Sequence, residues 1–192
     1  MPNFNYFDLA SNTVWKDYVL RFCFDSISGL DPAGNVYPAL AESWDFDEDN
    51  LKVTVHLREG VKFHDGVEMT ADDVVFTYTV LRDGTTLSSS IIDAFDADGD
   101  GMVSQDEIDG TVDADGDGVY EGVKKIDNYT VEMTMAKPYG QFFLTTLGIT
   151  IIPKHIWENH LSEDGTVDTL WGSNEAAAIG TGPFYYAGGK AN

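Results

Sequence analysis

The sequence is poor in basic residues and has no long apolar run. It has 11 Lys and Arg residues against 33 Asp and Glu residues, which gives a formal net charge of −22 at neutral pH. Such a charge repels nucleic-acid phosphates, so we exclude nucleic acid as a partner. Its apolar runs fall short of the roughly 18 residues that a membrane-spanning helix needs, so we expect no such helix.

The sequence also has a single cysteine. Cys23 has no second cysteine within the chain, so no intramolecular disulfide can form. Apolar residues flank it and no histidine lies near it in the sequence, which predicts a buried packing thiol and not a nucleophile.

Catalytic and targeting motifs are absent as well. No P-loop, Rossmann fingerprint, nucleophile elbow or His-Glu-x-x-His sequence occurs, so we expect a protein that is not an enzyme. The chain begins Met1-Pro2-Asn3, without the basic and apolar segments of a signal peptide, and we expect that any export signal has been removed.

Hydrophobic periodicity predicts a mixed α+β fold. Apolar and polar residues alternate over 51–58 and over 129–135, which predicts two half-buried strands of an antiparallel sheet. Helical spacing predicts helices over 13–27 and over 74–81, the second preceded by a capping box at 70–73. Further patterns predict helices over 139–147 and 153–160 and a strand over 182–186.

Five ordered blocks of sequence are similar to one known family. Leu-Ala-Glu-Ser-Trp occupies 40–44, Leu-Arg-Glu-Gly-Val-Lys-Phe-His-Asp-Gly occupies 57–66, and Met-Thr-Ala-Asp-Asp-Val-Val-Phe follows within 69–76. A Leu-Asp-Pro-Ala-Gly-Asn turn at 30–35 precedes them, and Ile-Gly-Thr-Gly-Pro-Phe at 179–184 follows them. Together these blocks resemble the family 5 extracellular solute-binding proteins, the peptide- and nickel-binding group.

The resemblance implies a fold and a function. The fold is the first lobe of a type II periplasmic-binding-protein-like structure, with a mixed or antiparallel sheet and flanking helices. Residues 1–92 and 124–192 would form this lobe in part, because the chain is much shorter than family members. Such proteins trap a solute, here an oligopeptide or dipeptide, between two lobes and pass it to the permease subunits of an ABC importer without chemical change. We therefore expect a monomer in the periplasm or at the outer cell surface, held at the membrane through a segment outside these 192 residues.

The resemblance also suggests candidate ligand contacts. In relatives the segment before the first helix lines the ligand cleft, which makes Asn12, Thr13 and Trp15 candidates. An Asn amide can hold a peptide backbone and a Trp ring can cover an apolar side chain. Helix capping by Asn12 and core packing by Trp15 explain the same residues.

An acidic insert at 93–123 interrupts the family pattern. It holds eleven Asp and Glu residues and no Lys or Arg. Its first half matches an EF-hand-like calcium loop, with Asp at positions 1, 3 and 5, glycine at 6 and Glu at 12. The predicted ligands are Asp96, Asp98, Asp100, the Met102 carbonyl, a water held by Ser104, and Glu107.

The second half of the insert repeats the first incompletely. Position 12 is Lys124, which cannot bind a cation, although Glu121 or an outside carboxylate such as Asp109 could complete the site. The candidate ligands of this weaker loop are Asp113, Asp115, Asp117, the Val119 carbonyl and Glu121. A calcium-stiffened insert and a solvated acidic spacer both remain open, as does a calcium-dependent structural or adhesive surface module in place of solute capture.

Overall fold

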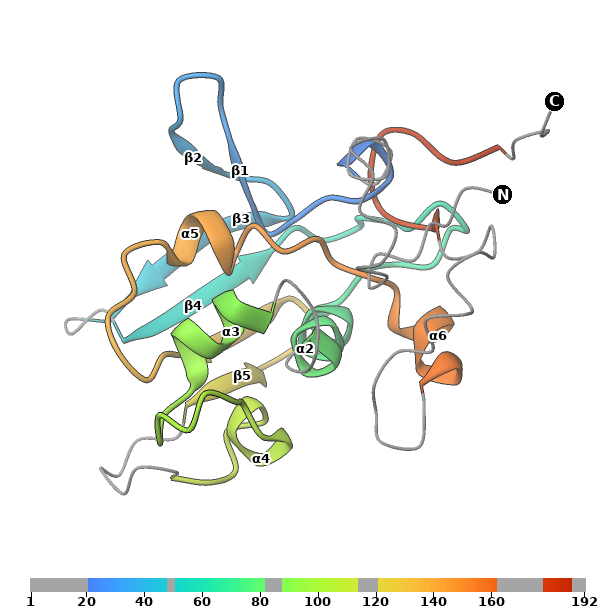
Figure 1. The fold of residues 1–192 in the computed structure, drawn as a ribbon. Coiled ribbons are helices and arrows are strands. Elements are labelled where there is room, and N and C mark those ends of the chain that lie inside the picture. The colour runs from blue at the N-terminus through green and yellow to red at the C-terminus, as the bar shows by residue number, and fades with distance from the viewer. Residues whose placement is uncertain (1–20, 48–50, 82–87, 114–120, 162–177, 188–192) are drawn as a thin grey trace, which may run out of the picture.

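The fold joins a four-stranded antiparallel sheet to a set of helices. The computed structural model describes residues 21–47, 51–81, 88–113, 121–161 and 178–187 (Figure 1). The sheet has the order β3-β4-β6-β5, and a separate antiparallel hairpin pairs β1 with β2. The strands are β1 Ser28–Leu30, β2 Val36–Pro38, β3 Ala41–Phe46, β4 Lys52–Leu57, β5 Gly122–Lys125 and β6 Thr130–Thr134.

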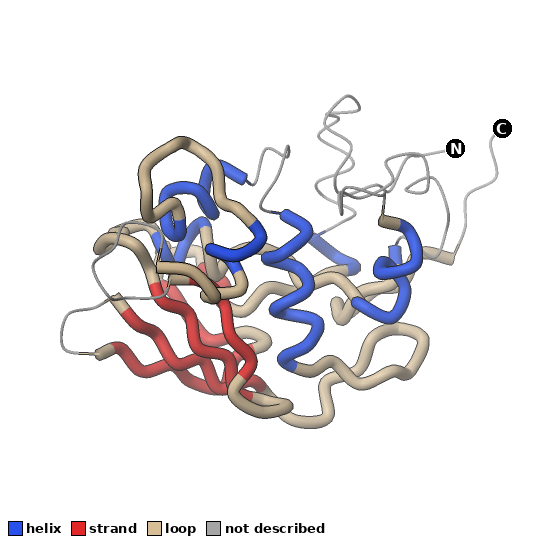
Figure 2. Tube along the Cα trace, turned by 90° about the horizontal axis from the view of Figure 1, so that it is seen from below, coloured by secondary structure: helices blue, strands red, loops and turns tan. Residues whose placement is uncertain are grey.

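The helices lie to one side of the sheet (Figure 2). Helix α2 packs against β5 and β6, α4 packs against α2 and β5, and α5 packs against α3 and β1. Their bounds are α2 Ala71–Leu81, α3 Ser88–Phe95, α4 Gln105–Ile108, α5 Phe142–Thr145 and α6 Lys154–Trp157, which is followed by the short 3-10 helix η2 Glu158–His160.

The two strands predicted from alternation are confirmed as β4 and β6. In β4 Val53, Val55 and Leu57 are buried and the residues between them are half-buried, as a strand with one face on the core requires. In the register Val53 lies opposite Met133 and Val55 opposite Val131, so the same face of both strands is apolar. These two strands therefore confirm the antiparallel sheet of the predicted α+β fold.

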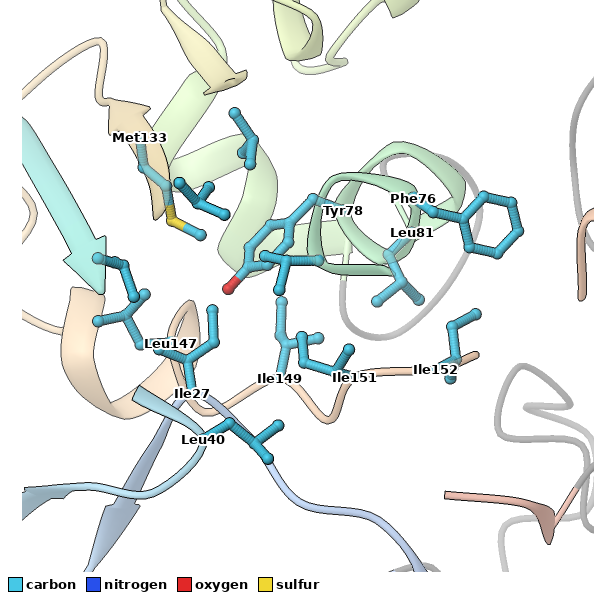
Figure 3. Close-up of a cluster of buried hydrophobic side chains, with 14 of the residues drawn as sticks. Ile27, Leu40, Phe76, Tyr78, Leu81, Met133, Leu147, Ile149, Ile151 and Ile152 are labelled. Atoms are coloured by element: carbon cyan, nitrogen blue, oxygen red, sulfur yellow. The ribbon is translucent and has the colours of Figure 1, made fainter. Parts of the chain in front are cut away.

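Part of the buried core lies between α2 and the segment that follows α5, residues 146–154 (Figure 3). Tyr78 and Leu81 point from α2 toward the chain that holds Ile149 and Ile151, and all four side chains are at most 1% exposed. Figure 3 also shows Ile27 and Leu147 in the same cluster. Burial of large apolar side chains at this density provides most of the stability of the lobe.

Polar side chains of α2 fasten the same segment. Thr77 Oγ1 accepts a hydrogen bond from the Ile152 N–H (3.1 Å), and Tyr78 donates its hydroxyl to the Thr146 carbonyl (2.6 Å). Asp73 Oδ1 accepts from the Lys154 N–H (2.9 Å). Because buried backbone groups need partners, these three side chains hold a segment that belongs to no sheet.

Several predicted elements differ from the structure, and the helix predicted over 139–147 is limited to α5, Phe142–Thr145. The helix predicted over 13–27 is helical at 21–23 among the described residues, and the chain then becomes extended. Ser26 forms an antiparallel bridge with Thr150, and the Ile151 N–H donates to the Asp25 carbonyl (2.9 Å), so tertiary pairing outweighs the helical pattern there. The strand predicted over 182–186 is an irregular stretch instead.

Candidate functional site

The first acidic loop connects two helices, as a calcium loop does. Helix α3 ends at Phe95, Asp96 follows directly, and α4 begins at Gln105. Gly101, the sixth residue of the loop, has φ 87°, a left-handed conformation that favours glycine. Its N–H donates to Asp96 Oδ2 (3.2 Å), so the chain folds back over the first carboxylate. The local backbone therefore has the sharp turn that the spacing predicts.

Three of the predicted metal ligands come together in this loop. One carboxylate oxygen from each of Asp96, Asp98 and Glu107 lies within 4.8 Å of the other two. Asp100 is not part of this group, and its Oδ1 accepts the Met102 N–H (2.8 Å). The structure thus gathers positions 1, 3 and 12 of the loop.

Ser104 and Glu107 form a capping box at the start of α4. Ser104 Oγ accepts from the Glu107 N–H (3.2 Å), and Glu107 Oε2 accepts from the Ser104 N–H (2.8 Å). We expected Ser104 to hold a water for the metal, and the structure gives its hydroxyl a capping role. The reciprocal pair fixes Glu107 on the first turn of α4, with its carboxylate turned back toward the loop.

The other predicted site residues are only partly described. Asp113 and Glu121 border the second loop, and Glu121 is buried at 3% exposure just before β5. The remaining candidates lie outside the described residues: Asp115, Asp117 and Val119 in the second loop, and Asn12, Thr13 and Trp15 near the start of the chain. Their roles stay predictions.

A junction between two distant family blocks gives His64 a role that sequence reasoning missed. The His64 N–H donates to the Gly180 carbonyl (3.0 Å), and the Gly180 N–H donates to His64 Nδ1 (3.3 Å). Nε2 is 2.8 Å from the Gly182 carbonyl, which fits the tautomer protonated at Nε2. The partners lie 116 and 118 residues away, so no local pattern could have shown them.

The two glycines of this junction allow close contact between backbones. A Cβ on Gly180 would collide with the Cys23 carbonyl, and one on Gly182 would collide with the Phe22 and Cys23 backbone. The Gly182 N–H donates to the Cys23 carbonyl (2.9 Å), which places the segment directly beside the end of the first helix. The Gly-Thr-Gly block is therefore a packing requirement of the lobe.

Exposed aromatic rings surround the same junction. Phe22 is 52% exposed, Phe184 61% and Tyr185 72%, and the Phe22 and Phe184 rings meet edge to face at 5.5 Å. The Tyr185 ring lies 6.4 Å from the His64 ring. Phe22, Phe184 and Tyr185 are therefore all largely open to solvent.

Ionisable groups of the family blocks at 57–66 and 69–76 take part in internal bonds. His155 Nε2 lies 2.7 Å from Asp65 Oδ2. Burial works to raise the pKa of Asp65, but the bond from His155 and the Val67 N–H outweigh it and lower that pKa. For Asp73 the balance is reversed, and burial raises its pKa in spite of the Thr70 and Lys154 N–H donors.

A hollow of about 1220 Å³ is lined by residues of β3 and β4, by the stretch 58–61 and by the turn before β6. Glu68 Oε1 accepts from two of the lining residues, through the Gly60 N–H (2.9 Å) and the Tyr129 hydroxyl (2.7 Å). The Tyr129 hydroxyl and the Gly60 N–H lower the pKa of Glu68, and Glu68 raises the pKa of Tyr129. Glu68 thus ties the turn at 59–60 to the start of β6.

Comparison with known proteins defines the class of this fold. Residues 35–192 match the family described as bacterial extracellular solute-binding proteins, family 5, middle region. The chain belongs to this family. Its members are extracellular or periplasmic transport proteins and are not enzymes. Within the described ranges, no helix combines the length and the hydropathy needed to cross a bilayer.

Individual relatives differ in the ligands that their names give. The chain is 31% identical over 160 residues to heme-binding protein A of Haemophilus influenzae and 29% identical over 161 residues to the dipeptide-binding protein of Escherichia coli. These matches cover 79% and 78% of the chain and 26% of each relative, so the chain spans about a quarter of their length.

A solved structure shows the same architecture. The oligopeptide-binding protein AppA of Bacillus subtilis, in complex with a nonapeptide, aligns with a TM-score of 0.70 at 27% identity, over 94% of this chain and 31% of that one. Such neighbours are type II periplasmic binding proteins, which confirms the predicted fold class. The helices and antiparallel sheet form part of one lobe of that fold.

Proposed function

We propose that this chain belongs to a protein that captures peptides outside the cytoplasm and delivers them to the permease of an ABC importer. The observation that supports this most strongly is the family match over 35–192 together with the alignment to a peptide-bound relative at a TM-score of 0.70. Capture would proceed by closure of two lobes on the ligand, with no bond made or broken. The proposal includes a monomer and candidate contacts at Asn12, Thr13 and Trp15.

Peptide is the proposed solute because relatives are named for peptides and because the net charge of the chain disfavours the competing anionic solute. Both the dipeptide-binding relative and the nonapeptide complex point to peptide backbones, and they span a wide range of peptide lengths. Heme is the competing ligand, because the relative at 31% identity is named for it. A net charge of −22 also disfavours an anionic solute such as heme, whose propionates would meet a repulsive field.

The internal bonds of the described part of the lobe suit a protein in which this lobe moves as one rigid body. Helix α2 fastens residues 146–154 through three side chains, and the bonds of His64 to Gly180 and Gly182 fasten that stretch to the block at 57–66. In this proposal the insert at 93–123 is stabilised by calcium and takes no part in solute capture. The adhesive alternative is less well supported, since family blocks lie on both sides of the insert.

Uptake by cells tests the proposal. We would delete the gene in its source and measure uptake of labelled dipeptide, nonapeptide and heme, with a complemented strain as the control. The proposal predicts that uptake of at least one peptide falls and that complementation restores it. Loss of heme uptake alone would replace peptide by heme, and unchanged uptake of all three solutes would reject the proposal.

A further inference from the structure

One buried carboxylate oxygen in the acidic loop has no partner. Glu107 is 5% exposed, and its Oε2 accepts the Ser104 N–H while its Oε1 is buried without a hydrogen bond. Burying an oxygen of a charged group without a partner costs free energy, because no hydrogen bond within the protein replaces the lost hydration. A cation beside Oε1 would offset this cost.

Other carboxylate oxygens of the loop lie close enough to Glu107 to bind the same cation. Oxygens of Asp96, Asp98 and Glu107 lie within 4.8 Å of one another. Ligand oxygens around one calcium ion stand about 2.3–2.6 Å from it and hence up to about 5 Å apart, so a single ion can contact all three. The insert contains no Lys or Arg, and among the described residues no salt bridge involves these three carboxylates.

Helix α4, which follows the loop, attaches the loop to the hydrophobic core. Val103 and Ile108 are each 1% exposed within the main hydrophobic cluster. Gly122, the first residue of β5, lies so close to α4 that an added Cβ would collide with the Glu107 and Ile108 carbonyls. Helix α4 is therefore in direct contact with β5, one of the two edge strands of the sheet.

We infer that the loop 96–107 binds one calcium ion, which ties α3 to α4 and thereby stabilises the β5 edge of the lobe. The class of ligand follows from the donors, because an all-oxygen set with three carboxylates is hard and contains no histidine or thiol for zinc or copper. Calcium suits it better than magnesium, since a flexible loop readily provides six or more oxygens and magnesium prefers to keep its waters. This inference is independent of the solute that the protein captures.

Calorimetric titration of Ca²⁺ into chelator-treated protein, with thermal melts at both end points, tests the inference. The decisive variant is Glu107→Gln, because Gln can still accept the Ser104 N–H and so keeps the helix cap. Asp98→Asn is a second variant, and its matched control is Asp93→Asn, an exposed residue of the same insert that lies outside the cluster.

The inference predicts binding of one ion per chain and a higher melting temperature with calcium. Glu107→Gln and Asp98→Asn should weaken binding by about tenfold or more, and Asp93→Asn by much less. Glu107→Gln without calcium should melt at or above the wild-type temperature, because it removes a buried unpaired charge. No binding at millimolar calcium, an unchanged calcium response in Glu107→Gln, or equal stabilisation by magnesium and by sodium at matched ionic strength would each overturn it.

Discussion

Replacing Thr77 with valine removes one buried hydroxyl from α2 and changes the side-chain volume very little. Thr77 is 0% exposed, and its Oγ1 is the acceptor for the Ile152 N–H, which lies in a segment outside any sheet. The hydroxyl also donates to the Asp73 carbonyl (2.7 Å). In the variant the Ile152 N–H stays buried and finds only a methyl group.

An unpaired buried N–H costs about 1–3 kcal/mol, so we expect Thr77→Val to lower the free energy of unfolding by about 2 kcal/mol. For a chain of this length that equals a fall of about 4–8 °C in melting temperature. Urea unfolding followed by tryptophan fluorescence measures the change. Thr54→Val is the matched control, because Thr54 is half-buried on β4 and makes no side-chain hydrogen bond within the described part of the chain.

Thr77→Ser should recover most of the loss, since it restores the hydroxyl and lacks only a methyl group. A Thr77→Val protein whose unfolding free energy lies within about 0.5 kcal/mol of wild type would refute the reasoning that side chains of α2 fasten residues 146–154. So would a control variant at Thr54 that loses as much stability as Thr77→Val.

Three further predictions follow from the site. Gly182→Ala should destabilise the lobe by about 1–3 kcal/mol in urea unfolding because its Cβ meets backbone atoms, while Gly140→Ala, with open space around it, should be near neutral. The pKa of Asp65 is lowered in the fold, so its bond to His155 stabilises the folded state at pH values above the unfolded pKa, and this stabilisation is lost as the pH falls. Asp65→Asn should lower the free energy of unfolding by about 1 kcal/mol at neutral pH and should flatten the acid side of the curve of stability against pH. An unaltered curve would contradict this prediction. Burial raises the pKa of Cys23, so the native thiol should react with a thiol reagent far more slowly than the unfolded one.

Local patterns in the sequence predicted the parts of the fold that local physics decides. Strands β4 and β6 alternate because one face is buried, and α2 begins where Asp73 Oδ2 accepts the Thr70 N–H (2.9 Å). The sequence analysis extended the first helix to residue 27, because its helical spacing says nothing of Thr150, with which Ser26 pairs. The stretch 182–186 has strand-like residues, yet its N–H groups donate to the end of the first helix.

Part of the candidate site could likewise be predicted from local sequence, and part could not. The cluster of Asp96, Asp98 and Glu107 could be predicted because these residues lie within twelve consecutive positions whose spacing is typical of a calcium loop. The bonds of His64 to Gly180 and Gly182 could not, since they depend on how two distant segments pack. Nor could the unpaired Oε1 of Glu107, because burial of a single atom is a property of the folded chain.

Native mass spectrometry of the protein, purified from its source in the form that the source produces, tests the central claim most directly. If the protein captures peptides, it should retain one peptide per molecule, release it on denaturation and rebind peptides of different lengths from a defined mixture. A protein that is free of small ligands when isolated, and that binds neither dipeptide nor nonapeptide at millimolar concentration, would contradict the account.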